Sequence, residues 1–292
     1  MKHFYTLLAL ALSFFSITGA QNPIVVSEEE VSFGNGNVNG YSVTIPEVSY
    51  EQTLKDWIKY LESGTRSKVV QKGNNLSIFG AKVKPLSEDP VNVYSIVTND
   101  NSGVKIQTAM ELERDNYAGS TEYANARKYL FDFAKDQYEA VVNDQLKEEE
   151  RKLRDLNSDL KSLERDQEKM QKSTASATET IEEERQSLAD LNSSLAALSP
   201  QQYQGGDSAQ FTGMGAASPE AVKDLEKERK KINKQIRRTE KSIQKAERDI
   251  RESERELPGN LSKQEDAQRL VDEQEEVVEF HRQKLETIKA YK

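Results

Sequence analysis

The chain contains no cysteine and only two histidines, His3 and His281, among its 292 residues. Without cysteine there is no disulfide framework, so packing alone must hold the fold together. His3 lies in an N-terminal segment that we expect to be removed, which leaves His281 as the one histidine and disfavours both a His/Cys metal site and a His-based nucleophilic triad. The sequence also lacks a Gly-rich phosphate-binding loop. We therefore predict no catalytic residue, no cofactor and no metal, and a protein that is not an enzyme.

One enzymatic alternative stays open. Asp and Glu number 50, so paired carboxylates are too abundant for any single pair to be informative. A carboxylate-based hydrolase within the first domain is therefore the competing hypothesis.

Long hydrophobic runs are also absent, apart from one at the N-terminus. Lys2 precedes an almost wholly apolar stretch, residues 4–17, and the small residues Thr18-Gly19-Ala20 follow it. This order is typical of a secretory signal peptide, here residues 1–20, with a membrane anchor as the alternative. The run is shorter than the roughly 20 residues that span a bilayer. We expect an exported protein, periplasmic or extracellular, with no transmembrane segment after signal cleavage. Without a cysteine after the signal we expect no lipid anchor.

The chain has fewer basic than acidic residues. Its 41 Lys and Arg against 50 Asp and Glu give a net charge of −9 at pH 7. Nucleic-acid binding needs clustered basic charge, so we expect no nucleic acid partner. One segment of the chain is nevertheless rich in basic residues. Taken alone, this basic cluster indicates binding to an anionic lipid or a nucleic acid. We favour instead a charged coiled-coil face matched by an acidic partner helix. The cluster comprises Lys223, Lys227, Arg229, Lys230, Lys231, Lys234, Arg237, Arg238 and Lys241.

Aromatic residues are concentrated before residue 140, which predicts a compact domain at residues 41–140. Residues 21–40 carry the run Gly34-Asn35-Gly36-Asn37, which is typical of turns, so we expect a flexible N-terminal segment there. Alternating apolar residues predict a strand over residues 41–45, and a capping box opens a helix at Ser49. Four strand-like runs follow at residues 68–71, 76–83, 91–97 and 104–112, and a second helix begins near Ser120 or Thr121.

Short turns separate these strands, which favours antiparallel neighbours. The run Asn99-Asp100-Asn101-Ser102-Gly103 has the residue types of a calcium loop but lacks its later acidic ligand, so a hairpin turn is favoured. The order β-α-β-β-β-β-α resembles one repeat of the TATA-binding-protein-like fold, in element order only. We predict an α+β domain with a small antiparallel sheet, and the resemblance implies no activity.

A heptad repeat begins after residue 140. Thirteen of the 17 positions spaced alternately by four and three residues between Val142 and Leu198 are apolar. These positions line up along one side of a helix as an apolar seam. A seam of this length predicts a long helix whose apolar side is covered by another helix. We expect the domain's second helix to continue into it, as one arm of an antiparallel coiled-coil hairpin at residues 141–292. The parts are an arm at 141–198, a loop at 199–218 and a second arm at 219–292.

The second arm contains Pro258-Gly259, yet its heptad phase is the same on both sides. Two alternatives stay open for it, a break near residues 258–261 and a kinked continuous helix. Folding the chain about the loop places Leu163 against Leu257 and Met170 against Ile250. The same register sets Glu179 and Glu182–Glu184 opposite the basic cluster. Homo-oligomerisation also stays open, because the polar seam residues Glu149, Gln167 and Glu184 can face a second hairpin.

Several features together resemble a group of uncharacterised exported proteins of Bacteroidota. They are the mature start at Gln21, the Trp57 helix, the Gly80-Ala81-Lys82-Val83 strand and the Glu/Lys-rich coiled coil. No activity is attached to that group, so the resemblance implies none.

We predict a non-enzymatic exported protein, an interaction or spacer module of the cell envelope with a protein partner. Candidate partner-binding residues are Tyr203, Phe211 and Met214 in the loop. A second candidate surface is the uncovered face of the sheet, where either Ser42 and Thr44 or their neighbours point outward. The alternative is an α/β domain that binds a small ligand or glycan between sheet and helix, with a coiled-coil oligomerisation arm.

Overall fold

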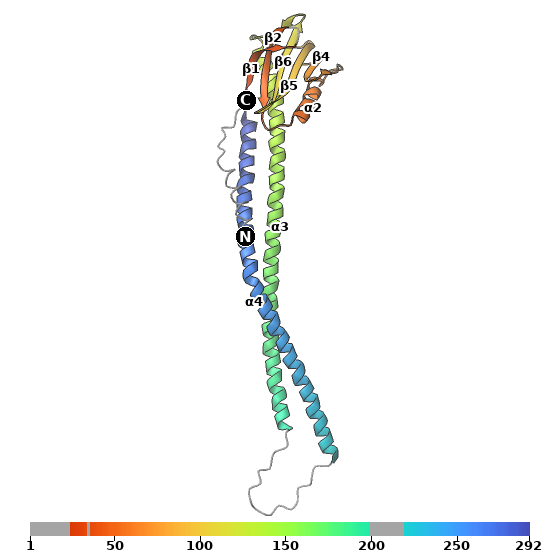
Figure 1. Ribbon diagram of the computed structural model, residues 1–292, viewed down its shortest axis with the longest axis vertical. Coiled ribbons are helices and arrows are strands. Elements are labelled where there is room, and N and C mark those ends of the chain that lie inside the picture. The colour runs from red at the N-terminus through yellow and green to blue at the C-terminus, as the bar shows by residue number, and fades with distance from the viewer. Residues whose placement is uncertain (1–23, 34–35, 199–218) are drawn as a thin grey trace, which may run out of the picture. The chain divides into compact units, whose positions relative to one another are not determined.

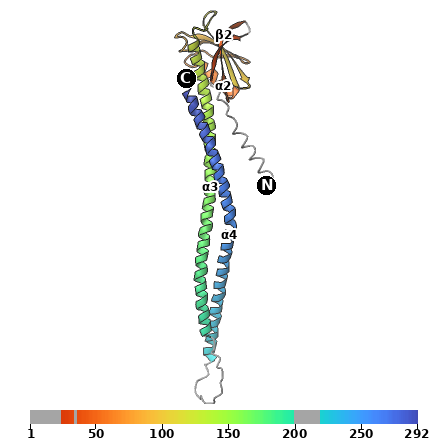
Figure 2. The same cartoon turned by 90° about the vertical axis from the view of Figure 1, so that its left-hand side faces the viewer.

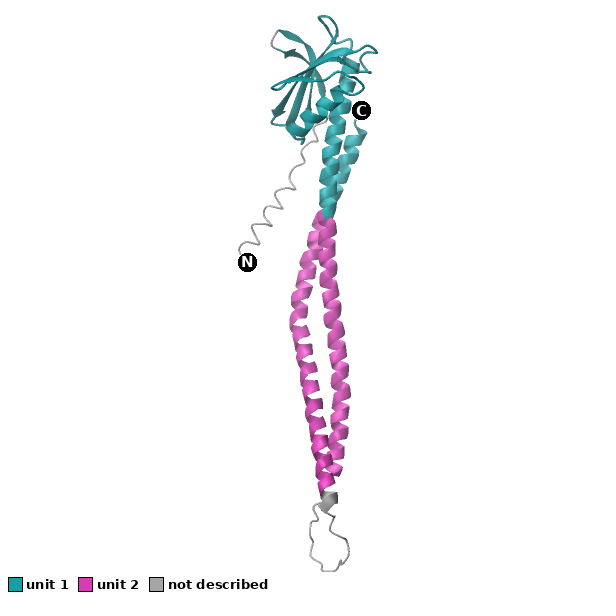
Figure 3. Ribbon diagram, turned by 90° about the vertical axis from the view of Figure 1, so that its right-hand side faces the viewer, with its two compact units in different colours: residues 1–151, 276–292 teal, residues 152–275 magenta. Residues whose placement is uncertain are grey.

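The computed structural model describes residues 24–33, 36–198 and 219–292. They form an antiparallel sheet and two long helices packed together, so the predicted α+β class is confirmed. The chain divides into two compact units (Figure 3). Unit 1 contains the described residues up to Arg151 together with Glu276–Lys292, and unit 2 contains Lys152–Glu275.

A seven-stranded antiparallel sheet forms in unit 1, counted over the described residues (Figure 1). Its spatial order is β1-β2-β6-β5-β4-β3, with β7 paired to β6. The Asn99–Gly103 run is a hairpin turn as predicted, because Asp100 pairs with Gly103 at the end of the β5–β6 ladder. The strands are β1 (Val26–Ser32), β2 (Asn37–Ile45), β3 (Val70–Lys72), β4 (Asn75–Ala81), β5 (Val91–Asp100), β6 (Gly103–Glu113) and β7 (Asn116–Tyr117).

Strand β1 lies where the sequence predicted a flexible segment. It pairs with β2 from Val26 opposite Val43 to Ser32 opposite Asn37, and Val26 and Val31 are both buried. Three consecutive glutamates interrupt its alternation, so no period of two marks this strand in the sequence. One of them, Glu29, accepts hydrogen bonds from Lys105 Nζ at 3.2 Å and from Gln107 Nε2 at 2.6 Å. These long-range contacts, rather than local propensity, account for its order.

Helix α2 (Tyr50–Leu61) begins as predicted, with Ser49 as the N-cap whose hydroxyl accepts from the Gln52 amide. Figures 1 and 2 show α2 and the first turns of helix α3 (Tyr123–Ala197) on one side of the sheet. Between them the ring of Trp57, which has no exposed surface, lies edge-on to Phe133 with 4.8 Å between ring centroids. This aromatic packing and the apolar inner face of the sheet form the core of unit 1.

Helix α3 is continuous from Tyr123 to Ala197, as the absence of a breaker predicted. Helix α4 (Pro219–Ala290) is also continuous, with Pro258 in its interior. Of the two alternatives for the second arm, the unbroken helix is therefore correct. A proline inside a helix costs about 3 kcal/mol. Packing of the half-buried seam residues Leu257 and Asn260, on either side of Pro258, offsets this cost.

The end of α4 belongs to unit 1 and is held there by a buried lysine. Lys284 is 7% exposed, and its Nζ donates to both carboxylate oxygens of Glu47 at 2.6 and 2.7 Å. Gln145 Nε2 and Tyr138 Oη also donate to this carboxylate, at 3.2 and 3.4 Å. Glu47 itself has φ of 61°, in the left-handed region that a glutamate rarely adopts. The loop after β2 thus anchors the C-terminal helix by charge.

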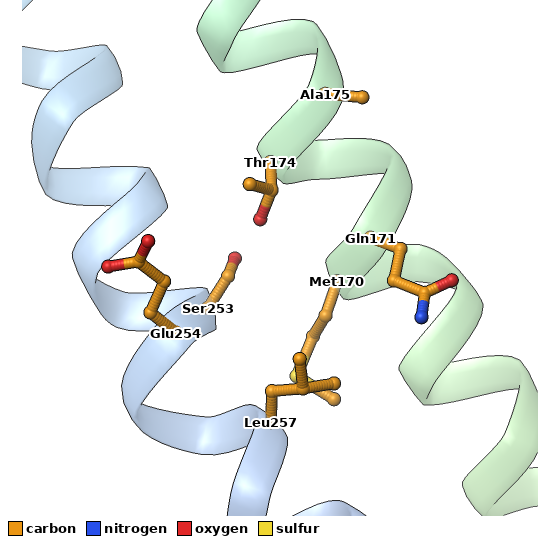
Figure 4. A pocket seen from close by; sticks show the side chains of 7 residues that line it. All are labelled: Met170, Gln171, Thr174, Ala175, Ser253, Glu254 and Leu257. Atoms are coloured by element: carbon orange, nitrogen blue, oxygen red, sulfur yellow. The ribbon is translucent and has the colours of Figure 1, made fainter.

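In unit 2 the helices α3 and α4 pack along the predicted seam, but in a register displaced by one heptad. Leu163 lies beside Gln264 instead of Leu257, since Gln264 Nε2 donates to the Leu163 carbonyl at 3.3 Å. Met170 lies beside Leu257 instead of Ile250 (Figure 4). The predicted register was therefore wrong.

The physical reason is that a heptad repeat offers apolar layers in every register, so the polar seam residues decide between them. Here Gln264 Nε2 donates to Gln167 Oε1 at 2.9 Å and to Asn260 Oδ1 at 2.5 Å, so three polar seam residues satisfy one another. In the predicted register Gln167 would face Ser253, and this amide pair would be lost.

Candidate functional site

The predicted loop residues Tyr203, Phe211 and Met214 lie outside the described residues, so their partner-binding role stays a prediction. The strands that form the second predicted surface, the uncovered face of the sheet, lie within the described residues. On β2, Tyr41, Val43 and Ile45 are buried toward the helices. Their neighbours therefore lie on the opposite face, which we call the open face, because residues alternate along a strand. None of the described helices lies on it.

Four aromatic rings gather on the open face around Tyr94. The ring centroid of Tyr94 lies 5.8 Å from that of Phe33, 6.1 Å from Phe79 and 6.3 Å from Tyr117. They come from β4, β5, β7 and the end of β1, elements far apart in sequence. Phe79 is 56% exposed, so the group presents a large apolar ring at the surface. We call these four rings with Asn92 and Glu111 the Tyr94 cluster.

The carboxylate of Glu111 is the charged group of the Tyr94 cluster. Its Oε2 accepts from Asn92 Nδ2 at 2.9 Å and from Tyr94 Oη at 3.1 Å, and its Oε1 accepts from the Asp115 amide at 3.0 Å. The hydrogen bond from Asn92 first, and that from Asp115 next, lower the pKa of Glu111. Burial and the hydrogen bond to Glu111 raise the pKa of Tyr94 to about 12. The cluster therefore presents a fixed carboxylate and a neutral phenol at neutral pH.

The backbone at Gly80 positions one member of the cluster, Asn92. Gly80 has φ of 82° and lies at an irregularity of the β4–β5 ladder between Ile78 and Ala81. This backbone conformation favours glycine. The Gly80 amide donates to Asn92 Oδ1 at 3.2 Å, which orients the Asn92 side-chain amide toward Glu111. The bulge thus fixes the polar part of the site.

Polar side chains lie beside the Tyr94 cluster on the same face. Ser42 and Thr44 point to the open face, opposite Gln107 and Lys105 respectively in the β2–β6 ladder. Of the two predicted alternatives, Ser42 and Thr44 therefore lie on the open face, where Thr44 is half-buried and Ser42 is only 6% exposed. Glu29 pairs with Lys105 and Gln107 there, so these groups are already engaged with one another. The Tyr94 cluster is the part of the open face that combines exposed apolar area with a fixed charge.

A hollow of about 280 Å³ lies between the helices of unit 2. Figure 4 shows the Thr174 and Ser253 hydroxyls directed toward each other, with Met170 beside Leu257 below them. Small residues at this seam layer leave a gap because they cannot fill the space between two helices. The hollow lies between seam residues of the two helices, so we assign it to seam packing.

Neither a metal-binding cluster nor a membrane-spanning helix occurs among the residues that the structure describes. No group of three or more His, Cys, Asp and Glu could hold a metal ion there. His281 occupies a seam position of α4 and its ring contacts that of Phe280 at 5.4 Å. Within the same described part of the chain, no helix is both long and apolar enough to cross a membrane.

No protein-family model matches the chain, and neither a curated protein nor a solved structure shows significant similarity to it. The Tyr94 cluster was not identified from the sequence. Its one local signal was the alternation of Asn92 and Tyr94 with buried valines in β5. Sequence alone could not show that Phe33, Phe79 and Tyr117 meet Tyr94, because that depends on the strand order.

Proposed function

We propose that the protein is a non-enzymatic, exported interaction module of the cell envelope, and that unit 1 binds a protein partner through the Tyr94 cluster. The observation that carries this proposal is an exposed Phe79 beside the ring of Tyr94, whose hydroxyl donates to the carboxylate of Glu111. Aromatic anchors at the centre of an interface supply most of its binding energy, and a rigid polar group beside them gives orientation. The open face offers both on a folded sheet.

The long helices extend the proposal. The order β-α-β-β-β-β-α, to which the structure adds strands β1 and β7, resembles one repeat of the TATA-binding-protein-like fold. The helices α3 and α4 form an antiparallel coiled-coil hairpin that acts as a spacer. The burial pattern of α3 supports a coiled-coil hairpin, because its seam positions are buried or half-buried while most of their neighbours are exposed. The loop residues Tyr203, Phe211 and Met214 are a second contact point. A second hairpin packed on the half-buried seam would make the protein a homo-oligomer.

Envelope cross-linking followed by affinity capture tests the proposed binding surface. Phe79→Ser should abolish capture of a partner that the unaltered protein retains. Val70→Ser is the matched control, because Val70 is similarly exposed, at 52%, on the edge strand β3 and outside the Tyr94 cluster. Unchanged emission of the buried Trp57 shows that both variants are folded. Equal capture by the Phe79 and Val70 variants would refute the assignment of the surface.

A small-ligand or glycan-binding domain is the second candidate function. Aromatic rings next to a carboxylate and an amide are the groups that recognise a sugar, since rings cover its apolar face and polar atoms bind its hydroxyls. A thermal-shift screen with envelope glycans distinguishes the two functions. A glycan that stabilises the unaltered protein but not Glu111→Gln supports the glycan function. No shift with any glycan, together with Phe79-dependent protein capture, supports the protein partner.

A further inference from the structure

A continuous stripe of basic side chains runs along helix α4 in unit 2. Its members recur every three or four residues, which places them on one face of the helix. All are exposed, and no acidic residue interrupts this face between Lys223 and Arg248. We call this face the basic stripe. It comprises Lys223, Lys227, Lys230, Lys234, Arg237, Arg238, Lys241, Lys245 and Arg248.

The basic stripe lies on the side of α4 that faces away from α3. The buried seam residues Ile232, Thr239 and Ala246 mark the side toward α3. Lys234 follows Ile232 by two residues, about 200° around the helix at 100° per residue, and Lys241 stands in the same relation to Thr239. The stripe therefore cannot meet α3 in any register of the two helices.

The acidic side chains expected to match the basic cluster do not do so. Glu179 and Glu182–Glu184 form no ion pair with it within the described residues, and Arg185–Glu247 at 3.7 Å is the ion pair that joins the helices there. Inside the stripe, Lys227 pairs with Asp224 at 2.8 Å, and the described residues hold no second ion pair to any of its members. The predicted matching of the cluster by an acidic partner helix was therefore wrong.

We infer that the basic stripe is a docking surface for the anionic headgroups of a phospholipid membrane. Charge complementarity carries the assignment, because clustered Lys and Arg on an amphipathic or exposed helix bind anionic lipid surfaces. The stripe is about 38 Å long at 1.5 Å per residue, so its charges can contact several headgroups at once. No apolar side chain belongs to it, so binding is peripheral, without insertion into the hydrocarbon.

Nucleic acid fits the stripe less well. Single-stranded nucleic acid is bound by aromatic side chains that stack on bases, and the basic stripe contains none. The export predicted from the N-terminal segment also places the protein where phospholipid surfaces are abundant. This inference goes beyond the proposed function and does not depend on the Tyr94 cluster.

Co-sedimentation of the purified full chain with lipid vesicles tests the inference. We expect binding at low salt to vesicles of equal parts phosphatidylcholine and phosphatidylglycerol, and none to phosphatidylcholine alone. Each basic residue at an anionic surface contributes about fivefold to partitioning. The triple variant Lys230→Glu, Lys234→Glu and Arg237→Glu should therefore lower binding at least about a hundredfold. High salt should abolish binding, because it screens exposed charge.

A matched control variant distinguishes the effect of the basic stripe from the effect of the total charge of the chain. Lys161→Glu, Arg165→Glu and Lys263→Glu change the same number of charges at exposed positions outside the stripe, and this variant should bind vesicles nearly as well as the unaltered protein. Far-UV circular dichroism shows whether both variants keep their helices, and a milder Lys-to-Gln set replaces the triple if it unfolds. Equal losses in both variants, or no binding of the unaltered protein to anionic vesicles, would overturn the inference. Tighter, stripe-dependent binding to duplex DNA than to vesicles would also overturn it.

Discussion

Replacing Glu47 with Gln should destabilise unit 1 more than replacing its partner Lys284 with Met. Lys284 is 7% exposed, so Glu47→Gln leaves a buried ammonium without its counter-charge. Breaking a buried ion pair from one side costs about 3–5 kcal/mol. The side chain of Glu47 is 39% exposed, so we discount this figure for solvent screening and expect about 2–3 kcal/mol.

The Lys284→Met variant removes the buried charge but keeps an aliphatic side chain of similar length. Glu47 then still accepts from Gln145 and Tyr138 and is hydrated through its exposed part. We expect a loss of about 1 kcal/mol in the free energy of unfolding. The double variant should lie close to Lys284→Met alone, because no buried charge is left without a partner in either protein.

The pH dependence gives an independent check of the same pair. Burial by itself would raise the pKa of Glu47, but hydrogen bonds from Lys284 and Gln145 and the Lys284 charge hold it below its ordinary value. A lowered carboxyl pKa in the folded state stabilises the protein above the unfolded pKa of about 4.3. This stabilisation is lost as the pH falls through the folded pKa. The difference between the unaltered protein and Lys284→Met should therefore shrink below about pH 4.

Urea denaturation followed by Trp57 fluorescence measures these effects. Trp57 is the only tryptophan and lies in the core of unit 1, so its emission reports on that unit alone. The reasoning fails if Lys284→Met costs as much as Glu47→Gln at neutral pH. It also fails if the loss in Lys284→Met is undiminished at pH 3.

Three further predictions concern other parts of the chain. Gly40→Ala should destabilise unit 1 by about 1–3 kcal/mol in urea denaturation, because an added Cβ would lie 2.6 Å from a side-chain atom of Val31; an unchanged midpoint would contradict the close packing. Replacing Gln264 and Gln167 with Leu should raise the thermal midpoint but broaden spin-label distances between α3 and α4, because polar seam residues set the register at a cost in stability. Glu111→Gln should lower the pKa of Tyr94 from about 12 toward its ordinary value, as followed by NMR of labelled tyrosine; an unchanged titration would contradict the hydrogen-bonded carboxylate.

The local sequence pattern was sufficient to predict most helices and strands of this chain. The Ser49 capping box, the alternation in β2, β5 and β6, and the hairpin at Asn99–Gly103 each depend on neighbours in sequence, and each element formed where its pattern lay. The heptad seam likewise predicted which side of each long helix is buried. Such features are accessible to sequence because side-chain period and turn chemistry are local properties.

Strand β1, the register of the helices and the Tyr94 cluster required the tertiary structure. Strand β1 has no periodic signal and is ordered by its pairing with β2. The apolar layers of α3 and α4 fit one another in any register that differs by a whole heptad. The register was therefore decided by one network of side-chain amides around Gln264. The rings of the cluster meet only because β4, β5 and β7 come together in one sheet.

By itself, the sequence determined the class of the fold, the course of the first long helix and the face that each long helix buries, whereas the continuity of α4 through Pro258 was decided by the structure. The tertiary structure alone decided which residues from distant segments meet, at Glu47 with Lys284 and around Tyr94. The physical reason is that periodicity sets the direction of a side chain relative to its own element. The identity of its neighbour depends on how elements pair, and that choice is made by a few long-range polar contacts.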